Sequence, residues 1–303
     1  MDPGQLRLLA LIERHGSLSS AARALGLTPA AVTQQVARAE RDAGAPLVRR
    51  GPRGATLTAA GALLAAHGRI IDEQSARADG GLAALLGRLS LRLRIGAFQA
   101  AALHLLPPAL TALRHRHPDA DLSVMDVASE HGVDEVASGR LDMAVIASWG
   151  APIVAPPHVA VRELLLDPLV VVLPDDHPRA RDAAVRLEHL RDEAWVTILA
   201  GHAARTQFDR AASEAGFTPR IRFQTQSYDV AQALVGTGFG VALVSRLALT
   251  HVPGTTHREL ARPVLYRRVH AVTPSDATAT PLVGAFLGLL GEVARETSDA
   301  WRH

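Results

Sequence analysis

Glycine breaks in the first 44 residues constrain this sequence more than any other feature. Apolar residues recur at helical spacing from Leu6 to Ile12, and Gly16 ends this first helix because glycine readily adopts the left-handed conformation of helix C-termini. A second helix follows, with Ser19 as its expected N-cap and Gly26 at its end. Such closely spaced breaks allow only short helices in this part of the chain.

A third helix is expected from Thr28 to Gly44, where a capping threonine precedes a proline at the first helical position. Three short helices with a tight glycine turn between the second and third are typical of a helix-turn-helix. At about 100° per residue, the third helix has one apolar and one polar face. The apolar face comprises Val32, Val36, Ala39 and Ala43, and the opposite face with its flanks comprises Ala30, Thr33, Gln34, Ala37, Arg38 and Arg41.

The polar face of the third helix carries side-chain types that bind DNA. Threonine, glutamine and arginine bond to base edges and phosphates, and the acids Glu40 and Asp42 lie to the sides near the helix end. Residues 1–58 hold eight arginines and four acids, whereas the formal charge of the whole chain is only +2. Any surface that binds a polyanion is therefore expected at the N-terminus. The alternative is a surface helix whose arginines are merely solvated.

A short hairpin with a basic tip is expected after the third helix. Its arginines Arg50 and Arg53 are placed to touch phosphates or a narrow minor groove, where arginine is favoured by the negative potential. Thr58 then caps a long helix with apolar residues at every seventh position, which predicts a dimerising linker helix. These positions are Leu64, Ile71, Ala78 and Leu85.

Together these residues resemble the N-terminal winged helix-turn-helix of LysR-type transcriptional regulators. The resemblance rests on residues 16–25 (GSLSSAARAL), 28–36 (TPAAVTQQV), 46–50 (PLVRR) and 57–61 (LTAAG). This sequence departs from the family at Thr28-Pro29, which replaces a usual Ser-Gln pair, at Val48 and at Ala39. The lost glutamine transfers base recognition to Thr33 and Gln34. The residues expected to bind DNA are Ser19, Arg23, Thr28, Pro29, Ala30, Thr33, Gln34, Arg38, Arg50 and Arg53.

From residue 91 the pattern changes to alternating strands and helices, which indicates an α/β sheet. Two lobes are expected, the first from residues 91–160 and 268–303 and the second from residues 161–267. The first lobe is predicted to contain strands at 91–98, 121–127, 141–147 and 270–273, with helices at 103–115, 132–138 and 281–294. The second is predicted to contain strands at 169–173, 195–198 and 220–226, a helix at 205–215, and a helix before the glycine-rich segment 236–240.

This region resembles the LysR-type effector domain, which shares the two-lobed fold of periplasmic solute-binding proteins. Among the matching segments are residues 93–96 (LRIG), 139–145 (GRLDMAV), 216–220 (GFTPR) and 235–241 (VGTGFGV). The resemblance implies an effector site between the lobes, and α/β sheets bind ligands beyond strand ends, near helix N-termini. The residues expected there are Gln99, Ala100, Ala101, Ser129, Ser148, Trp149, Gly201, His202 and Gln226.

The nature of the effector stays open at this point. Two helix N-termini favour an anionic metabolite, and Trp149 favours a flat or apolar one. The alternative is that Trp149 and His202 pack inside separate lobes.

Several other kinds of site are not expected. The sequence contains no cysteine, which excludes disulfides, thiolate zinc sites and cysteine nucleophiles. Residues 236–240 lack the GxGxxG register of a dinucleotide loop, and His115 and His117 have no matching ligand cluster. We therefore expect no cofactor, no metal and no catalysis. The N-terminus has no secretion signal and no apolar run exceeds strand length, so a soluble cytoplasmic protein is expected.

The sequence thus predicts three parts: an all-α winged helix-turn-helix (1–58), a linker and dimerisation helix (59–90) and a two-lobed α/β effector domain (91–303) of the type 2 periplasmic-binding-protein kind. The expected function is ligand-responsive transcriptional regulation by a dimer or tetramer. Its expected partners are double-stranded promoter DNA, a small effector and RNA polymerase, without a membrane. The alternatives are a small-molecule-binding protein and an α/β enzyme without a role on DNA, which a gel shift would separate.

Overall fold

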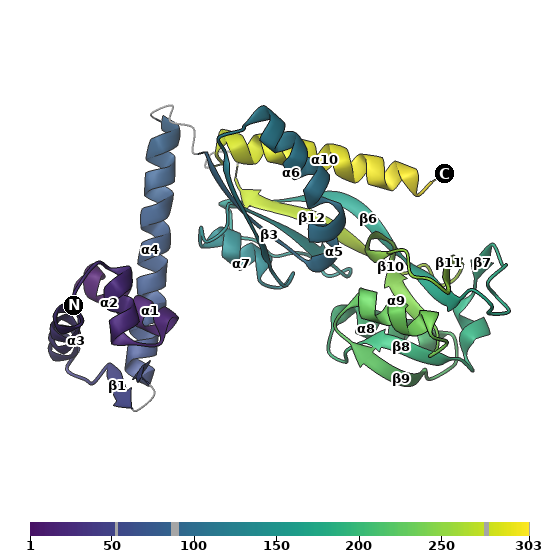
Figure 1. Cartoon of the computed structure of the whole chain (residues 1–303), viewed down its shortest axis with the longest axis horizontal. Coiled ribbons are helices and arrows are strands. Elements are labelled where there is room, and N and C mark those ends of the chain that lie inside the picture. Colours follow the sequence, from purple (N-terminus) through teal and green to yellow (C-terminus); the bar gives the residue numbers. More distant parts are fainter. Residues whose placement is uncertain (52–53, 86–90, 276–278, 303) are drawn as a thin grey trace. The chain divides into compact units, whose positions relative to one another are not determined.

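The computed structural model describes residues 1–51, 54–85, 91–275 and 279–302 (Figure 1). The chain divides into two compact units, the first of residues 1–90 with 138–140 and the second of residues 91–137 with 141–303. The N-terminal unit is helical apart from one hairpin, and the C-terminal unit alternates strands and helices. No described helix is both long and apolar enough to cross a membrane.

The first three helices begin and end close to their predicted positions. Gly16 and Gly44 cap their helices in the left-handed conformation, with φ of 66° and 65°, and the Thr28 hydroxyl accepts a backbone N–H of the first turn at 3.2 Å. The prediction of Ser19 as a cap is wrong, because Ser17 has the extended backbone of an N-cap and its hydroxyl accepts an N–H at 3.1 Å. The helices are α1 (Pro3–His15), α2 (Leu18–Ala24) and α3 (Pro29–Ala43).

The apolar face of α3 forms the core of the N-terminal unit with α1 and α2. Val32, Val36 and Ala39 are buried as predicted, whereas Ala43 is exposed because the helix ends there. The predicted hairpin is confirmed as two antiparallel strands. Its strands are β1 (Val48–Gly51) and β2 (Gly54–Leu57), and Arg53 at its tip lies outside the described residues.

The long helix α4 (Ala59–Leu85) follows Thr58, whose hydroxyl caps it by accepting the N–H of Gly61 at 3.0 Å. Helix α4 packs closely on α1, since a Cβ at Gly68 would lie only 2.1 Å from the carbonyl oxygen of Leu6. This close approach of two backbones requires glycine.

The apolar stripe predicted along α4 is only partly exposed in the single chain. Leu64 packs into the core of its own unit, whereas Leu63 and Ile70 are 64% and 50% exposed. Ile71 is half-buried, and the side chains of Ala78 and Leu85 lie outside what the structure describes. Among the α4 side chains that the structure describes, Leu63 and Ile70 are the exposed large apolar ones.

The C-terminal unit is built on a sheet with the strand order β4-β3-β5-β12-β6-β11-β7. Strand β6 is unusually long: its first half pairs with β12, and its second half pairs with β10 and β11. It thereby belongs to both lobes. The predicted boundary between the lobes at residue 161 is therefore wrong, because it falls inside β6. The strands are β3 (Arg92–Ala97), β4 (Asp121–Asp126), β5 (Met143–Ser148), β6 (Val159–Pro174), β7 (Ala184–Val185), β10 (Ala242–Ser245), β11 (Thr255–Leu260) and β12 (Tyr266–Pro274).

Helices of the first lobe cover this sheet, with α6 and α10 packed against each other (Figure 1). The single helix predicted at 103–115 is two helices, because Pro107 and Pro108 lack the N–H groups needed to continue α5 and instead occupy the start of α6. The helices are α5 (Gln99–His104), α6 (Leu106–Arg116), α7 (Gly132–Ala137) and α10 (Pro281–Ala300).

The second lobe adds a parallel pair, β8 (Ala194–Ile198) and β9 (Arg220–Thr225), with helices α8 (Ala203–Glu214) and α9 (Tyr228–Gly236). Two 3-10 turns, η1 (Leu187–Leu190) and η2 (Arg246–Ala248), complete it. Sequence patterns did not predict β7 or β11, which are short or half-exposed and lack a strong apolar alternation.

Candidate functional site

The outer face of α3 presents the polar groups that the sequence predicts. Gln34, Arg38 and Arg41 are exposed, and Thr33 is half-buried beside them. This arrangement follows from the helical period, because the residues opposite a buried face must point to solvent. The other expected positions, Ser19, Arg23, Pro29 and Ala30, are also exposed, and the Thr28 hydroxyl is engaged in capping.

The two acids of α3 are held away from the polar face. One carboxylate oxygen of Glu40 accepts the N–H groups of Leu47 and Val48, at 2.9 and 3.2 Å, and so ties the hairpin to α3. Asp42 accepts from the Gln5 amide at 2.6 Å, and this hydrogen bond lowers the pKa of the Asp42 carboxyl. Sequence analysis missed both roles, because the partners of Glu40 lie beyond the end of α3 and the partner of Asp42 lies in α1.

Of the two predicted hairpin arginines, Arg53 lies outside the described residues and only the backbone of Arg50 is described, whereas Arg49 beside it is exposed. Arg50 lies on β1 and its backbone pairs with Ala55, which fixes its position in the hairpin. The arrangement can hold a negatively charged groove or backbone through arginine while α3 presents amide and hydroxyl groups.

The C-terminal unit contains a cavity of about 1140 Å³ between its lobes. Eight of the nine residues predicted to meet there line it: Gln99, Ala100, Ser129, Ser148, Trp149, Gly201, His202 and Gln226. The prediction for Ala101 is wrong, because its side chain is fully buried in the core beneath α5. Trp149 and His202 line the same cavity, so they do not pack inside separate lobes.

Several polar groups of this cleft are already hydrogen-bonded within the protein. Ser129 accepts the N–H of Ala147 at 2.9 Å, and the Ser148 hydroxyl lies 2.9 Å from Nε2 of His270. The Gln99 amide donates to a carboxylate oxygen of Asp229 at 3.0 Å, which joins α5 of the first lobe to α9 of the second. These bonds orient the cleft surface before any ligand arrives.

His202 caps α8 at the edge of the cleft. Its Nδ1 accepts the N–H of Ala204 at 3.2 Å, which requires an unprotonated nitrogen. Desolvation lowers the pKa of His202, Glu130 opposes this shift, and Arg267 adds to it. The imidazole is therefore neutral near neutral pH.

Sequence analysis missed Arg267, the buried cation of the cleft. Its Nε donates to Asp167 at 2.8 Å and its Nη2 to the Ser245 hydroxyl at 2.7 Å, and its guanidinium lies 4.6 Å from the ring centroid of Phe98. Arg267 is 5% exposed and Asp167 is fully buried. The available signal was an acid that interrupts an apolar run at residues 164–173, since a buried charge needs a partner.

Tyr228 is the second residue that sequence analysis missed. It lines the cleft at the start of α9, and the Arg267 guanidinium lies 6.0 Å from its ring centroid. Burial raises the pKa of the Tyr228 phenol to about 12, an effect that Arg267 opposes and Asp167 reinforces. The hydroxyl is therefore protonated and available as a donor.

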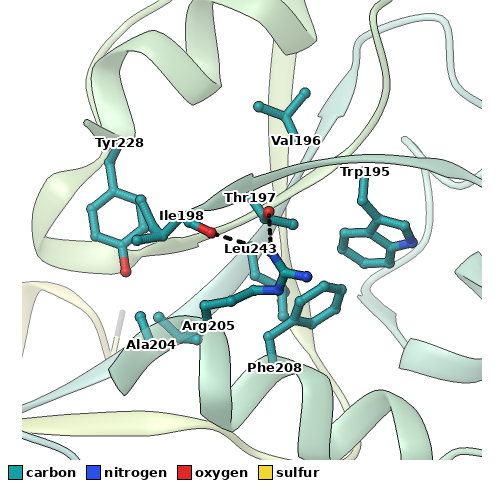
Figure 2. A pocket seen from close by; sticks show the side chains of 10 residues that line it. Trp195, Val196, Thr197, Ile198, Ala204, Arg205, Phe208, Tyr228 and Leu243 are labelled. Carbon is teal, nitrogen blue, oxygen red and sulfur yellow. Dashed lines mark hydrogen bonds between the residues drawn. The ribbon is translucent and has the colours of Figure 1, made fainter. Parts of the chain in front are cut away.

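A second, much smaller cavity of about 20 Å³ lies behind α8, with room for about one water molecule (Figure 2). Figure 2 shows the Arg205 guanidinium bonded to Thr197 and to the Ile198 carbonyl, at 3.1 and 3.5 Å. Arg205 also pairs with Asp209 one turn along α8, at 2.8 Å. These contacts fasten the start of α8 to β8 and so position His202.

Comparison with known proteins covers both units. Residues 3–62 match the family model described as a bacterial regulatory helix-turn-helix protein of the lysR family, and residues 87–295 match the LysR substrate binding domain. The RuBisCO operon transcriptional regulator of Allochromatium vinosum is 31% identical over 308 residues, with 96% of each chain covered.

Solved structures share the fold along the whole chain. Full-length OxyR from Pseudomonas aeruginosa, in a variant form, has a TM-score of 0.70 at 22% identity, with 97% of this chain and 95% of that chain covered. Full-length CbnR in complex with its target DNA has a TM-score of 0.55 at 21% identity, with 97% and 100% covered.

Proposed function

This chain belongs to the LysR family of transcriptional regulators, and on that premise we propose how its two units divide the work. Helix α3 enters the major groove of promoter DNA, and the hairpin arginines hold the backbone. A small metabolite binds between the lobes of the C-terminal unit and changes how the regulator engages its promoter. The protein acts in the cytoplasm, has no catalytic step, and acts on transcription by RNA polymerase.

The exposed polar face of α3 is the observation that carries this proposal. Gln34 stands at its centre with Arg38 and Thr33 beside it, and the helix's acids are bound internally. Glutamine and threonine can bond to base edges, whereas arginine can also neutralise phosphates. In a merely solvated surface helix, acidic side chains could lie on this face as readily as basic ones. Their absence from it favours a surface that binds DNA.

Footprinting tests the proposal. The full chain should protect DNA upstream of its own gene or of a divergently transcribed neighbour. It should bind that segment about a thousandfold or more tightly than random DNA of equal length. Equal affinity for both DNAs at matched salt would contradict sequence-specific regulation.

We further propose that the face of α4 that carries Leu63 and Ile70 is the linker interface of the oligomer. Leu63 and Ile70 lie one heptad apart, which is about two helical turns, and both are exposed in the single chain. Two such helices would bury these side chains against each other and place two α3 helices on successive major grooves.

Paired substitutions distinguish this face from the predicted one. Ile70→Asp should dissociate the linker pair in sedimentation experiments, because an unpaired carboxylate would be buried in the interface. Ile71→Asp affects a half-buried side chain and should reduce stability more than it changes the oligomeric state. An intact oligomer for Ile70→Asp would place the interface elsewhere.

The interlobe cleft is proposed as the effector site. Effector binding shifts the equilibrium between lobe arrangements only by its differential affinity for them, typically about 1–3 kcal/mol for coupled sites. The bond between Gln99 and Asp229 spans the lobes and is a contact that such a shift would alter.

A further inference from the structure

The interlobe cleft is lined by charges of both signs. Among the described residues that line it, Arg267 is cationic, Glu130 and Asp229 are anionic, and His202 is neutral near neutral pH. Asp167 lies behind the cleft and already balances the charge of Arg267. The lining therefore does not present the net positive charge that a purely anionic ligand would require.

Arg267 is prepared to bind one acid group. Its Nε and Nη2 are fixed on Asp167 and Ser245, and the rings of Phe98 and Tyr228 flank the guanidinium. Nη1 has no hydrogen-bond partner within the part of the chain that the structure describes, although the residue is only 5% exposed. A fixed guanidinium with a free N–H group at the wall of a cavity binds a carboxylate without further ordering of the side chain.

The phenol of Tyr228 adds a second donor beside Arg267. Its hydroxyl stays protonated because burial raises the pKa to about 12, and the residue lines the same cavity. The cavity therefore offers a carboxylate a neutral donor as well as a charged one.

The two carboxylates of the cleft require donors rather than acceptors. One oxygen of Asp229 accepts from the Gln99 amide, and its other oxygen has no partner in the described ranges. Glu130 lies in the loop after β4 and lines the cavity from the first lobe, whereas Asp229 lines it from the second. A ligand with a second acid group would meet these carboxylates with like charge, whereas an ammonium group would satisfy them.

The rest of the lining mixes uncharged polar side chains with an apolar patch. The apolar patch includes Trp149, Ile153 and Ile198, from both lobes, together with Pro152. Such a patch favours a ligand with an apolar body and disfavours one covered with hydroxyl or phosphate groups.

From these groups we infer that the cleft binds a small zwitterion, with its carboxylate on Arg267 and Tyr228 and its ammonium group facing Asp229 and Glu130. An amino acid with an apolar side chain has this chemistry. The inference rests on the proposed function in one respect only, that this cleft is the effector site.

Matched probes test the inference on the full chain by calorimetry and ligand-induced thermal shift. L-Phenylalanine carries both charged groups, 3-phenylpropanoate lacks the ammonium group, and 2-phenylethylamine lacks the carboxylate. The pair L-leucine and 4-methylpentanoate repeats the comparison with an aliphatic body. At least one of the two amino acids should bind about tenfold or more tightly than its analogues that lack one charged group.

Substitutions in the cleft should change this selectivity in a defined way. The double substitution Asp229→Asn with Glu130→Gln should weaken the binding of the amino acid. It should leave the binding of the deaminated acid unchanged or make it tighter. Tyr228→Phe should lower the affinity for both the amino acid and the deaminated acid by about tenfold or less, since it removes one neutral hydrogen bond. Arg267→Lys should lower the affinity for both carboxylate ligands more strongly. Unfolding curves show whether this variant is still folded. Glu163→Gln removes a carboxylate outside the cavity lining and is the matched control.

Three results would overturn the inference. They are equal affinity for the amino acid and its deaminated analogue, unchanged selectivity in the double variant, and no binding of any probe at millimolar concentration. None of these bears on DNA recognition, because specific footprints of the ligand-free protein test the proposed function separately. A chain that binds its promoter but shows no selectivity for zwitterions would retain the proposed function and lose this inference.

Discussion

The N-terminal and C-terminal units build their candidate sites in opposite ways. The DNA-facing surface centres on one helix, where Ala30, Gln34 and Arg41 share a face because of the helical period. The interlobe cleft draws on segments from Phe98 to Arg267, which only the sheet brings together. The first site therefore depends on local structure, and the second depends on the packing of the whole unit.

The two units are also held together by different interactions. In the N-terminal unit, α4 and α1 meet through a close backbone contact at Gly68. In the C-terminal unit, the buried pair of Asp167 and Arg267 joins β6 to β12 and reaches η2 through the N–H of Leu247 at 2.9 Å. Disruption of either contact should affect one unit, and the three tryptophans, all after residue 91, report only on the C-terminal unit.

The largest effect is expected for Asp167→Ala. This substitution leaves Arg267 buried without its partner, which should reduce the free energy of unfolding by about 3–5 kcal/mol. Tryptophan fluorescence during denaturant unfolding measures it. The control Glu163→Gln breaks the exposed pair with Arg268 and should have a much smaller effect, because water screens exposed ion pairs. Equal effects of the two substitutions would mean that the buried pair has no special role.

Gly68→Ala should destabilise the N-terminal unit by about 1–3 kcal/mol, because the new methyl group would collide with the α1 backbone. Helical circular dichroism should show an earlier transition, while tryptophan fluorescence stays unchanged. The matched control is Gly284→Ala on α10, where a Cβ meets nothing within 4 Å and helix propensity should add up to about 1 kcal/mol. A fluorescence transition that moved with Gly68→Ala would show that the two units do not unfold separately.

Gln34→Ala should weaken binding to specific DNA by about 1–3 kcal/mol and leave binding to random DNA unchanged. Gln35→Ala, at the exposed neighbouring position outside the predicted set, is the control. Quantitative footprinting measures both variants, whose unfolding transitions should match the wild type. Equal losses on specific and random DNA would show that Gln34 does not contact a base.

The smallest effect concerns pH. Burial lowers the pKa of His202 in the folded protein below its ordinary value of 6.5, so the unfolded chain binds a proton more readily. The resulting stability is present above pH 6.5 and is lost as the pH falls through the lower pKa of the folded state. His202→Asn keeps a side chain that caps α8 and should make stability less dependent on pH, as measured by fluorescence unfolding at several pH values. An identical pH dependence in this variant would exclude His202 as a contributor.

The N-terminal unit shows how far local patterns reach. Gly16, Thr28 and Gly44 fall where the sequence predicts helix ends, since caps depend on a few neighbouring residues. Helix α4 shows the limit of such patterns. A seven-residue repeat runs through Leu63 and Ile70 as well as through Leu64 and Ile71, and only contact with the core distinguishes the two.

In the C-terminal unit, the sequence determined most loops of the cleft but not the buried charged residues Arg267 and Asp167. Eight of nine predicted residues line the cavity, because strand ends and helix starts can be located from periodicity and the carboxyl ends of parallel strands share one edge. The partnership of Asp167, Ser245 and Arg267 was decided only by the tertiary structure. These residues lie up to 100 positions apart, and nothing local to any of them specifies which buried charge its side chain will meet.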